Sequence, residues 1–275
     1  MSADILNVET LASRIPDGAT LAIARDQGGA PMTTIRALIR RGARDLHLIG
    51  VPVVGIGGDM LIGAGCVRTY EGAGVTLGEY GAAPRFVEAV REGRIALKDS
   101  TCPAIHAALQ AGEKGLPFMP LRGILGTDIL RHRPEWKTID NPFAAGGGDP
   151  IVLLPALRPD IALIHAAKAD RLGNVWIGRD RELMTMAHAA KTTLATVEEI
   201  VDGNLMEDEL RAAATIPALY VGAVAEAKGG SLPIAMPGHY GDDDALLRDY
   251  VQAAKSRGGF EDFLVRFGAR DRVAA

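Results

Sequence analysis

Two glycine-rich stretches carry polar residues whose types and spacing could do chemistry. The first, residues 25–31 (RDQGGAP), joins a strand-like run to a helix-like run. Gly28 and Gly29 would let the backbone approach a ligand closely, and the free N–H groups at the start of the helix would attract an anion. The stretch matches neither the dinucleotide-binding fingerprint nor a P-loop. On this stretch alone, a plain tight turn is the simpler interpretation.

The second stretch, residues 71–81 (EGAGVTLGEYG), also lies between a strand and a helix and contains two carboxylates, Glu71 and Glu79. A carboxylate in a half-closed loop could act as a base or orient a substrate. The alternative is that Glu79 sits in the first turn before the helix that contains Arg85, where the helix dipole favours a negative charge. Both interpretations remain open.

A third stretch, residues 115–130 (GLPFMPLRGILGTDIL), follows what should be a buried strand. It contains Arg122, Gly123, Gly126 and Thr127, but no nucleophile next to a base. The sequence therefore raises the question of why two glycines, an arginine and a threonine are placed there.

The histidines and cysteines form no recognisable catalytic or metal motif. His106 and His165 each lie among small apolar residues, which is typical of hydrogen-bonded core or interface positions. Cys102 precedes a helix, where a thiolate would be stabilised, but without a nearby base we expect a small packing residue. With Cys66 it forms no disulfide framework. No metal-binding spacing and no nucleophile-elbow serine motif occurs, so we expect no metal and no Ser-His-Asp chemistry.

Composition indicates a water-soluble protein with a sizeable core. Of the 275 residues, 48% are hydrophobic and 5% aromatic, and the formal net charge is -4. No basic block occurs, so nucleic-acid and membrane-surface partners are not expected. The first residues contain no apolar signal segment, and no apolar run approaches the length of a membrane span. We therefore expect a cytoplasmic protein.

Strand-like and helix-like segments alternate along the chain. The expected strands include residues 20–24, 45–54, 66–72, 151–157, 160–167, 174–178, 192–200 and 221–227. The expected helices include residues 31–42, 58–65, 83–95, 103–115, 181–190, 206–214 and 242–256. Such alternation predicts right-handed crossovers and an α/β fold, an open, mostly parallel sheet flanked by helices. No linker is evident, so we expect a single domain over residues 1–275. Ligands of such sheets bind at the carboxyl ends of the strands.

Several segments together resemble the A (alpha) subunit of the family I coenzyme A-transferases, in the branch of glutaconate CoA-transferase. They are residues 58–67 (GDMLIGAGCV), the segment Gly81–Phe86, the third stretch above, residues 138–146 (TIDNPFAAG) and residues 160–178 (DIALIHAAKADRLGNVWIG). The resemblance extends over about residues 10–265. It implies the sheet fold that these transferases share with sugar-phosphate isomerases.

The resemblance also implies a heteromeric enzyme of acyl-CoA metabolism that moves CoA between an acyl-CoA and a carboxylic acid. In that family the nucleophilic glutamate belongs to the B subunit, in a Ser-Glu-Asn-Gly setting, and carries CoA as a thioester during the exchange. None of the fourteen glutamates of this chain is followed by Asn-Gly. The chain therefore resembles only the A subunit, with coenzyme A as the thioester substrate and no metal.

In such an enzyme, the A subunit would form a wall that holds the acyl group beside the partner's glutamate. The resemblance places Glu79 as a candidate catalytic residue in this wall. Candidate substrate-binding residues are Arg25, Gly28, Gly29, Gly74, Gly78, Tyr80, Arg122, Gly123, Gly126 and Thr127.

The chain departs from the family pattern at two loops. The family's first strand usually ends in Gly-Gly-Phe, whereas this chain reads Ala24-Arg25-Asp26. The glutaconate enzyme has a serine where this chain has Gly78, so glutaconate itself is not predicted as the substrate.

Three other functions remain as alternatives. One is the A subunit of a ring-opening C–C hydrolase of steroid catabolism. Those subunits carry an acidic residue near the start of the helix where this chain has Thr101-Cys102, although Glu79 could substitute. The others are a stand-alone sugar-phosphate isomerase and a non-catalytic scaffold for a B subunit.

Overall fold

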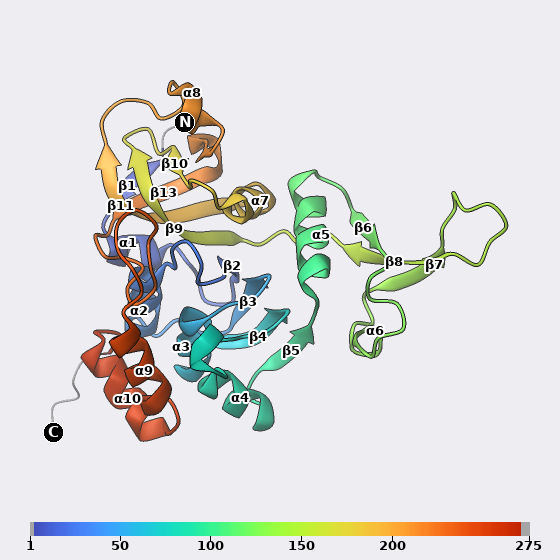
Figure 1. The fold of residues 1–275 in the computed structure, drawn as a ribbon, viewed down its shortest axis with the longest axis horizontal. Coiled ribbons are helices and arrows are strands. Elements are labelled where there is room, and N and C mark those ends of the chain that lie inside the picture. The colour runs from blue at the N-terminus through green and yellow to red at the C-terminus, as the bar shows by residue number, and fades with distance from the viewer. Residues whose placement is uncertain (1–2, 271–275) are drawn as a thin grey trace.

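The computed structural model describes residues 3–270 and consists of a large twisted sheet covered by helices, with a small sheet extending to one side (Figure 1). The large sheet has ten strands, and its main path runs β1-β13-β11-β9-β2-β3-β4-β5. All neighbours along this path are parallel. The α/β fold with an open, mostly parallel sheet is therefore confirmed.

The strands of the large sheet are β1 (Asp4–Leu6), β2 (Thr20–Ala24), β3 (Leu46–Val51), β4 (Val67–Gly72), β5 (Ala96–Asp99), β9 (Ile161–Asp170), β10 (Val175–Trp176), β11 (Thr192–Val201), β12 (Thr215–Ile216) and β13 (Val221–Glu226). The main helices are α1 (Val8–Ser13), α2 (Met32–Arg40), α3 (Ile56–Gly63), α4 (Pro84–Arg91), α5 (Cys102–Glu113), α7 (Arg181–Ala189), α8 (Glu209–Ala212), α9 (Asp244–Ala253) and α10 (Arg257–Arg266). No helix among residues 3–270 combines the length and the apolar character that crossing a bilayer requires.

Both faces of the large sheet are covered, as the near-continuous apolar strands require. Leu21 and Ile23 of β2 belong to a core shared with α1–α4, α9 and α10. Ala22 and Ala24 of the same strand belong to a second core with α5 and α7. Successive side chains of a strand point to opposite faces, so one strand contributes to both layers.

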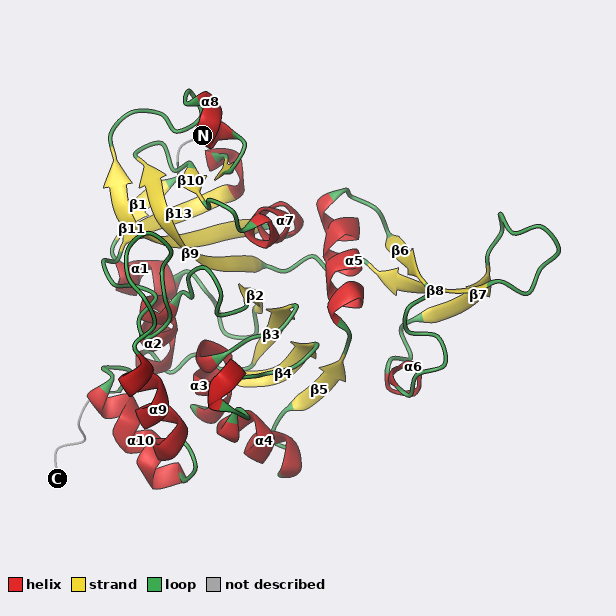
Figure 2. Cartoon of the chain, in the orientation of Figure 1, coloured by secondary structure: helices red, strands yellow, loops and turns green. Residues whose placement is uncertain are grey.

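The small sheet consists of β6 (Phe118–Leu121), β8 (Pro150–Pro155) and β7 (Lys137–Asp140), in that order, with α6 (Ile129–His132) between β6 and β7. We call residues 118–155 the arm. Figure 2 shows that the arm projects from α5 away from the large sheet. One face of the arm shares a core with α5 that includes Ala104, Ala108 and Val152. We propose that the chain is one domain, because α5 belongs to this core and to that of the large sheet.

The expectation of a buried strand before Arg122 is wrong. Phe118, the first residue of β6, is 43% exposed. β6 is an edge strand of the arm and pairs only with β8 among the described strands. An edge strand with one open face leaves alternate side chains in solvent, even when the local sequence is apolar.

The other expected elements differ from the structure mainly in length. The helix expected at residues 206–214 has only the four residues of α8, and the strand at 174–178 is the two-residue β10. β10 also runs antiparallel to β9, which the crossover pattern does not predict. Thr101 is the N-cap of α5, because its side chain accepts the N–H of Ala104 at 3.3 Å.

Candidate functional site

The carboxyl ends of β2 and β4 bring the first two glycine-rich stretches to one cavity of about 280 Å³. Arg25, Gly78, Glu79 and Tyr80, all candidates from the sequence, line this cavity. The remaining lining residues are Asp26, Gln27, Val53, Val54, Gly55, Ile56, Thr76, Leu77, Ile234, Asp242 and Leu247. We call it the loop cavity. It lies where an open parallel sheet is expected to bind its ligand.

Glu79 lies in a short 3-10 turn, Gly78–Tyr80, and its side chain is exposed. This turn precedes α4, which begins at Pro84, so the alternative of a carboxylate in the turn before that helix stays open. The hydroxyl of Tyr80 donates a hydrogen bond to Asp244 at the start of α9. This hydrogen bond raises the pKa of Tyr80 to about 12. Tyr80 therefore anchors the turn that presents Glu79.

Gly74 does not line the loop cavity but supports the loop beside it. Its carbonyl accepts a hydrogen bond from the Tyr70 hydroxyl at 2.6 Å and one from the Val54 N–H at 3.2 Å. Gly74 thereby ties the β4 loop to the loop that follows β3.

Asp26 is a polar residue of the cavity that the sequence analysis missed. The residue is half-buried, and its carboxylate accepts the Ile56 N–H, at the start of α3, at 2.7 Å. A side chain at Gly55 would place its Cβ only 1.8 Å from Asp26 Oδ2, so glycine is required there. Burial, with a smaller contribution from Asp242, raises the pKa of Asp26 to about 6.

The raised pKa of Asp26 gives a prediction with a definite sign. The folded protein disfavours the ionised form, so stability falls as pH rises from the unfolded value of 3.8 through about 6. Asp26→Asn removes the charge and keeps an oxygen acceptor for the Ile56 N–H. We expect the variant to be more stable than the wild type by about 1–2 kcal/mol above pH 7, with the difference lost below about pH 3. Thermal unfolding at both pH values measures this, and a difference that does not depend on pH would contradict it.

A larger groove of about 790 Å³ adjoins the loop cavity. Arg25 and Gln27 line both spaces, and Gly28 lines the groove. The remaining lining is mostly apolar and comprises Ala167, Trp176, Ile177, Gly178, Arg179, Asp180, Leu210, Ala214, Met236, Pro237 and Gly238. An apolar space with a few polar groups at its entrance is typical of a small-molecule site.

Gly29 shows why the loop after β2 needs glycine. Its φ angle is +119°, which disfavours other residues, and a Cβ there would lie 2.8 Å from Met236 Sδ and 3.1 Å from the His165 carbonyl. The backbone of the loop therefore packs directly onto β9 at His165 and onto the segment that contains Met236.

Two carboxylates and a histidine lie beside Arg25. Glu182 Oε1, at the start of α7, is 3.6 Å from Arg25 Nη1 and 3.5 Å from His106 Nε2 on α5. Burial raises the pKa of Glu182 and that of Asp180, while the charge of Arg25 opposes both shifts. His106 is only half-buried, so it contacts a charged cluster rather than an apolar core.

A buried hydrogen-bond network around His165 lies beneath the loop that follows β2. His165 is fully buried, and its ring nitrogens lie 2.9 Å from Thr196 Oγ1 and 2.8 Å from Glu198 Oε1. Burial alone would raise the pKa of Glu198, but hydrogen bonds from His165, Tyr240 and the Gly229 N–H lower it to about 2. The prediction that His165 is a hydrogen-bonded core residue is confirmed.

The third stretch does not meet the other two in this structure. Arg122, Gly123, Gly126 and Thr127 lie on the arm, and none of them lines the loop cavity or the groove. Arg122 forms a bidentate ion pair with Asp149, which is also in the arm. The Thr127 hydroxyl donates a hydrogen bond to the Ile124 carbonyl at 2.8 Å. Both polar side chains have partners within the arm.

The expectation that Cys102 is a packing residue is wrong, because its side chain is exposed at the start of α5. Cys66 is buried, which raises the pKa of its thiol to about 11. Within residues 3–270, no group of three or more histidine, cysteine, aspartate or glutamate side chains could hold a metal ion.

Comparison with known proteins gives consistent matches over nearly the whole chain. A family model described as "Coenzyme A transferase" matches residues 5–227. The A subunit of 3-oxoadipate CoA-transferase from Pseudomonas knackmussii is 32% identical, over 98% of this chain and 95% of that protein. The IpdA subunit of a cholesterol ring-cleaving hydrolase from Mycobacterium tuberculosis is 30% identical, over 92% of this chain and 88% of that protein.

Among solved structures, glutaconate coenzyme A-transferase from Acidaminococcus fermentans superposes with a TM-score of 0.88 and 26% identity. The superposition covers 97% of this chain and 89% of that chain.

Proposed function

The chain belongs to the coenzyme A transferase family, and we propose that it is the A subunit of a heteromeric enzyme whose B subunit supplies the catalytic glutamate. One observation carries the proposal. The loop cavity and the groove meet at Arg25 and offer glycine backbone and carboxylates, yet no glutamate of the chain is followed by Asn-Gly. The chain thus provides a binding site without the expected nucleophile.

In this proposal, CoA moves from an acyl-CoA to a carboxylic acid through a thioester on the partner's glutamate. Arg25 holds the carboxylate of the acyl group or of the acceptor at the junction of the two spaces. The backbone around Gly28 and Gly78 allows the substrate to approach closely, whereas Gly29 packs against Met236 and His165 and lines neither space. The apolar groove receives the remainder of the acyl group and limits access of water to the thioester.

We infer that the partner subunit covers the open side of the groove. Leu210 lines the groove and is 91% exposed, and Leu219, which follows α8, is 71% exposed. Large apolar side chains that are this exposed in a single chain are typical of surfaces that a permanent partner buries. The loop of α8 would then lie between the two subunits, beside the reacting groups.

A second candidate function is the ring-opening hydrolysis of a CoA thioester. The observation in its favour is Glu182, a carboxylate with a raised pKa that lies 3.5 Å from His106 on α5. It could serve as a base although α5 itself starts with Thr101-Cys102. The transferase is the better-supported function, because the family model and the 3-oxoadipate relative both describe CoA transfer.

The two functions differ in their need for an acceptor. With its B subunit, a transferase should consume more than one equivalent of acyl-CoA only when a second carboxylic acid is present, and it should release no free CoA. We expect a panel of short dicarboxylic and 3-oxo acyl-CoA thioesters to show this dependence, followed by chromatography of the CoA products. Consumption of a cyclic acyl-CoA without any acceptor, with water added across a C–C bond, would instead establish the hydrolase.

A further inference from the structure

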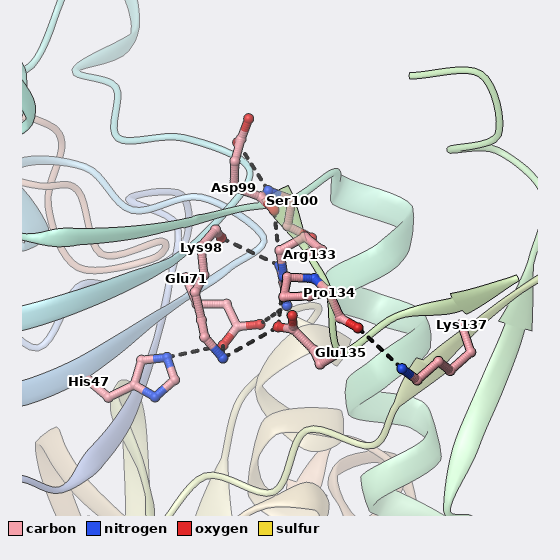
Figure 3. Close-up of polar contacts among 9 residues, drawn as sticks. All are labelled: His47, Glu71, Lys98, Asp99, Ser100, Arg133, Pro134, Glu135 and Lys137. Carbon is pink, nitrogen blue, oxygen red and sulfur yellow. Dashed lines mark hydrogen bonds and ion pairs between the residues drawn. The ribbon is translucent and has the colours of Figure 1, made fainter. Parts of the chain in front are cut away.

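A second polar cavity, of about 230 Å³, lies between the large sheet and the arm. None of its lining residues lines the loop cavity or the groove. The large sheet contributes His47, Glu71 and Lys98, and the arm contributes Arg133 and Glu135 (Figure 3). The other lining residues are Thr20, Ile49, Ser100, Ala104, Ile105, Ala108, Trp136, Pro155, Ala156, Leu157 and Arg158.

Glu71 and Arg133 form a buried ion pair that lines this cavity and is held in place by the protein itself. Both side chains are buried, and Arg133 donates to Glu71, to Glu135 at 2.9 Å and to the Asp99 carbonyl at 2.9 Å. Burial alone would raise the pKa of Glu71, but His47 and Arg133 lower it below its ordinary value. Arg133 is thus fully engaged by the protein and ties the arm to β4 and β5.

Two donors of the cavity remain available to a ligand. Ser100 is 5% exposed, and its hydroxyl has no hydrogen-bond partner among residues 3–270. Lys98 Nζ approaches Glu135 only at 3.4 Å and Glu71 only at 4.0 Å. A buried hydroxyl without a partner destabilises the folded state, so an acceptor placed between Ser100 and Lys98 would stabilise the fold.

The charges around the cavity select the kind of ligand. Lys98, Arg133 and Arg158 are cationic and Glu71 and Glu135 are anionic, which leaves one positive charge when His47 is neutral. A monoanion balances this charge, whereas a dianion would be repelled by the two carboxylates. We propose that this cavity binds a small monocarboxylate, held by the Lys98 ammonium and the Ser100 hydroxyl between the large sheet and the arm.

Titration calorimetry of the full chain with sodium acetate tests the proposal, at constant ionic strength set by sodium chloride. We expect one equivalent to bind in this cavity of the wild type, apart from any acetate that binds at Arg25. Lys98→Met and Ser100→Ala should each weaken binding at least about 10-fold, because each removes a hydrogen bond to a charged group. The matched control Lys228→Met removes a lysine that is 78% exposed elsewhere and should leave the affinity unchanged. Arg25→Met should also leave it unchanged, which separates this site from the proposed transferase site.

A second readout does not depend on the variants. Acetate should slow amide hydrogen exchange in the arm of the wild-type chain, since the ligand would join the arm to the large sheet. The titration extends to millimolar acetate, about 100 times the protein concentration. The proposal would be overturned if no saturable binding of acetate were seen in that range. Unchanged affinity in both Lys98→Met and Ser100→Ala, or binding of inorganic phosphate in place of acetate, would also overturn it.

Discussion

The purified chain alone is expected to give no CoA exchange between any acyl-CoA and any carboxylic acid. The reason is chemical, since exchange requires a carboxylate that forms a thioester, and the chain lacks the Glu-Asn-Gly setting of the family's nucleophile. Without that covalent step, the proposed acyl-binding loops around Arg25 and Glu79 would not transfer CoA. Addition of the cognate B subunit should restore exchange.

The assay is measurement of acyl-CoA and free CoA by chromatography, with this chain by itself, the isolated B subunit, and the two mixed. A B subunit in which the catalytic glutamate is replaced by glutamine is the matched control, because it keeps the assembly and removes the nucleophile. Robust turnover by the isolated chain would contradict the proposal and favour a stand-alone enzyme.

Glu79→Gln should lower the turnover of the assembled enzyme at least about 10-fold and shift the thermal midpoint by only a few degrees. The exposed carboxylate of Glu79 lines the loop cavity, on a turn that Tyr80 anchors to α9. Glutamine keeps the size and much of the hydrogen bonding but removes the charge. The effect on rate should therefore exceed the effect on stability, which is at most about 1 kcal/mol for an exposed carboxylate near a helix terminus.

Glu92→Gln is the control, because this exposed glutamate ends α4 and lines neither the loop cavity nor the groove. It should leave turnover unchanged. If Glu79→Gln keeps full turnover and only lowers the thermal midpoint, Glu79 has a structural role and is not part of the reacting site.

The large sheet could be predicted from the sequence because its strands are buried on both faces. Runs such as residues 20–24 and 160–167 are mostly apolar, and β2 and β9 are found there. β5 and β7 were missed, because ALKD and KTID look like loop sequences when read alone. They are strands only because neighbouring strands offer hydrogen bonds and because both lie at sheet edges that tolerate polar side chains.

The candidate site was predictable only where it follows strand ends. Arg25 and Glu79 were found because each lies in a glycine-rich loop after an apolar run. Asp26 also directly follows that first run, and its position could have identified it. Glu182 and Trp176 could not be found this way, because the fold brings them to Arg25 from far along the chain. Arg25 and Glu182 are separated by about 160 residues.

The most direct test of the central claim is to locate the covalent thioester in the assembled enzyme. The A–B complex is incubated with acyl-CoA in the absence of an acceptor acid, denatured, digested and examined by mass spectrometry. The proposal predicts CoA bound to one glutamate of the B subunit, with none on this chain. A CoA thioester on Glu79, Glu182 or any other residue of this chain would contradict it.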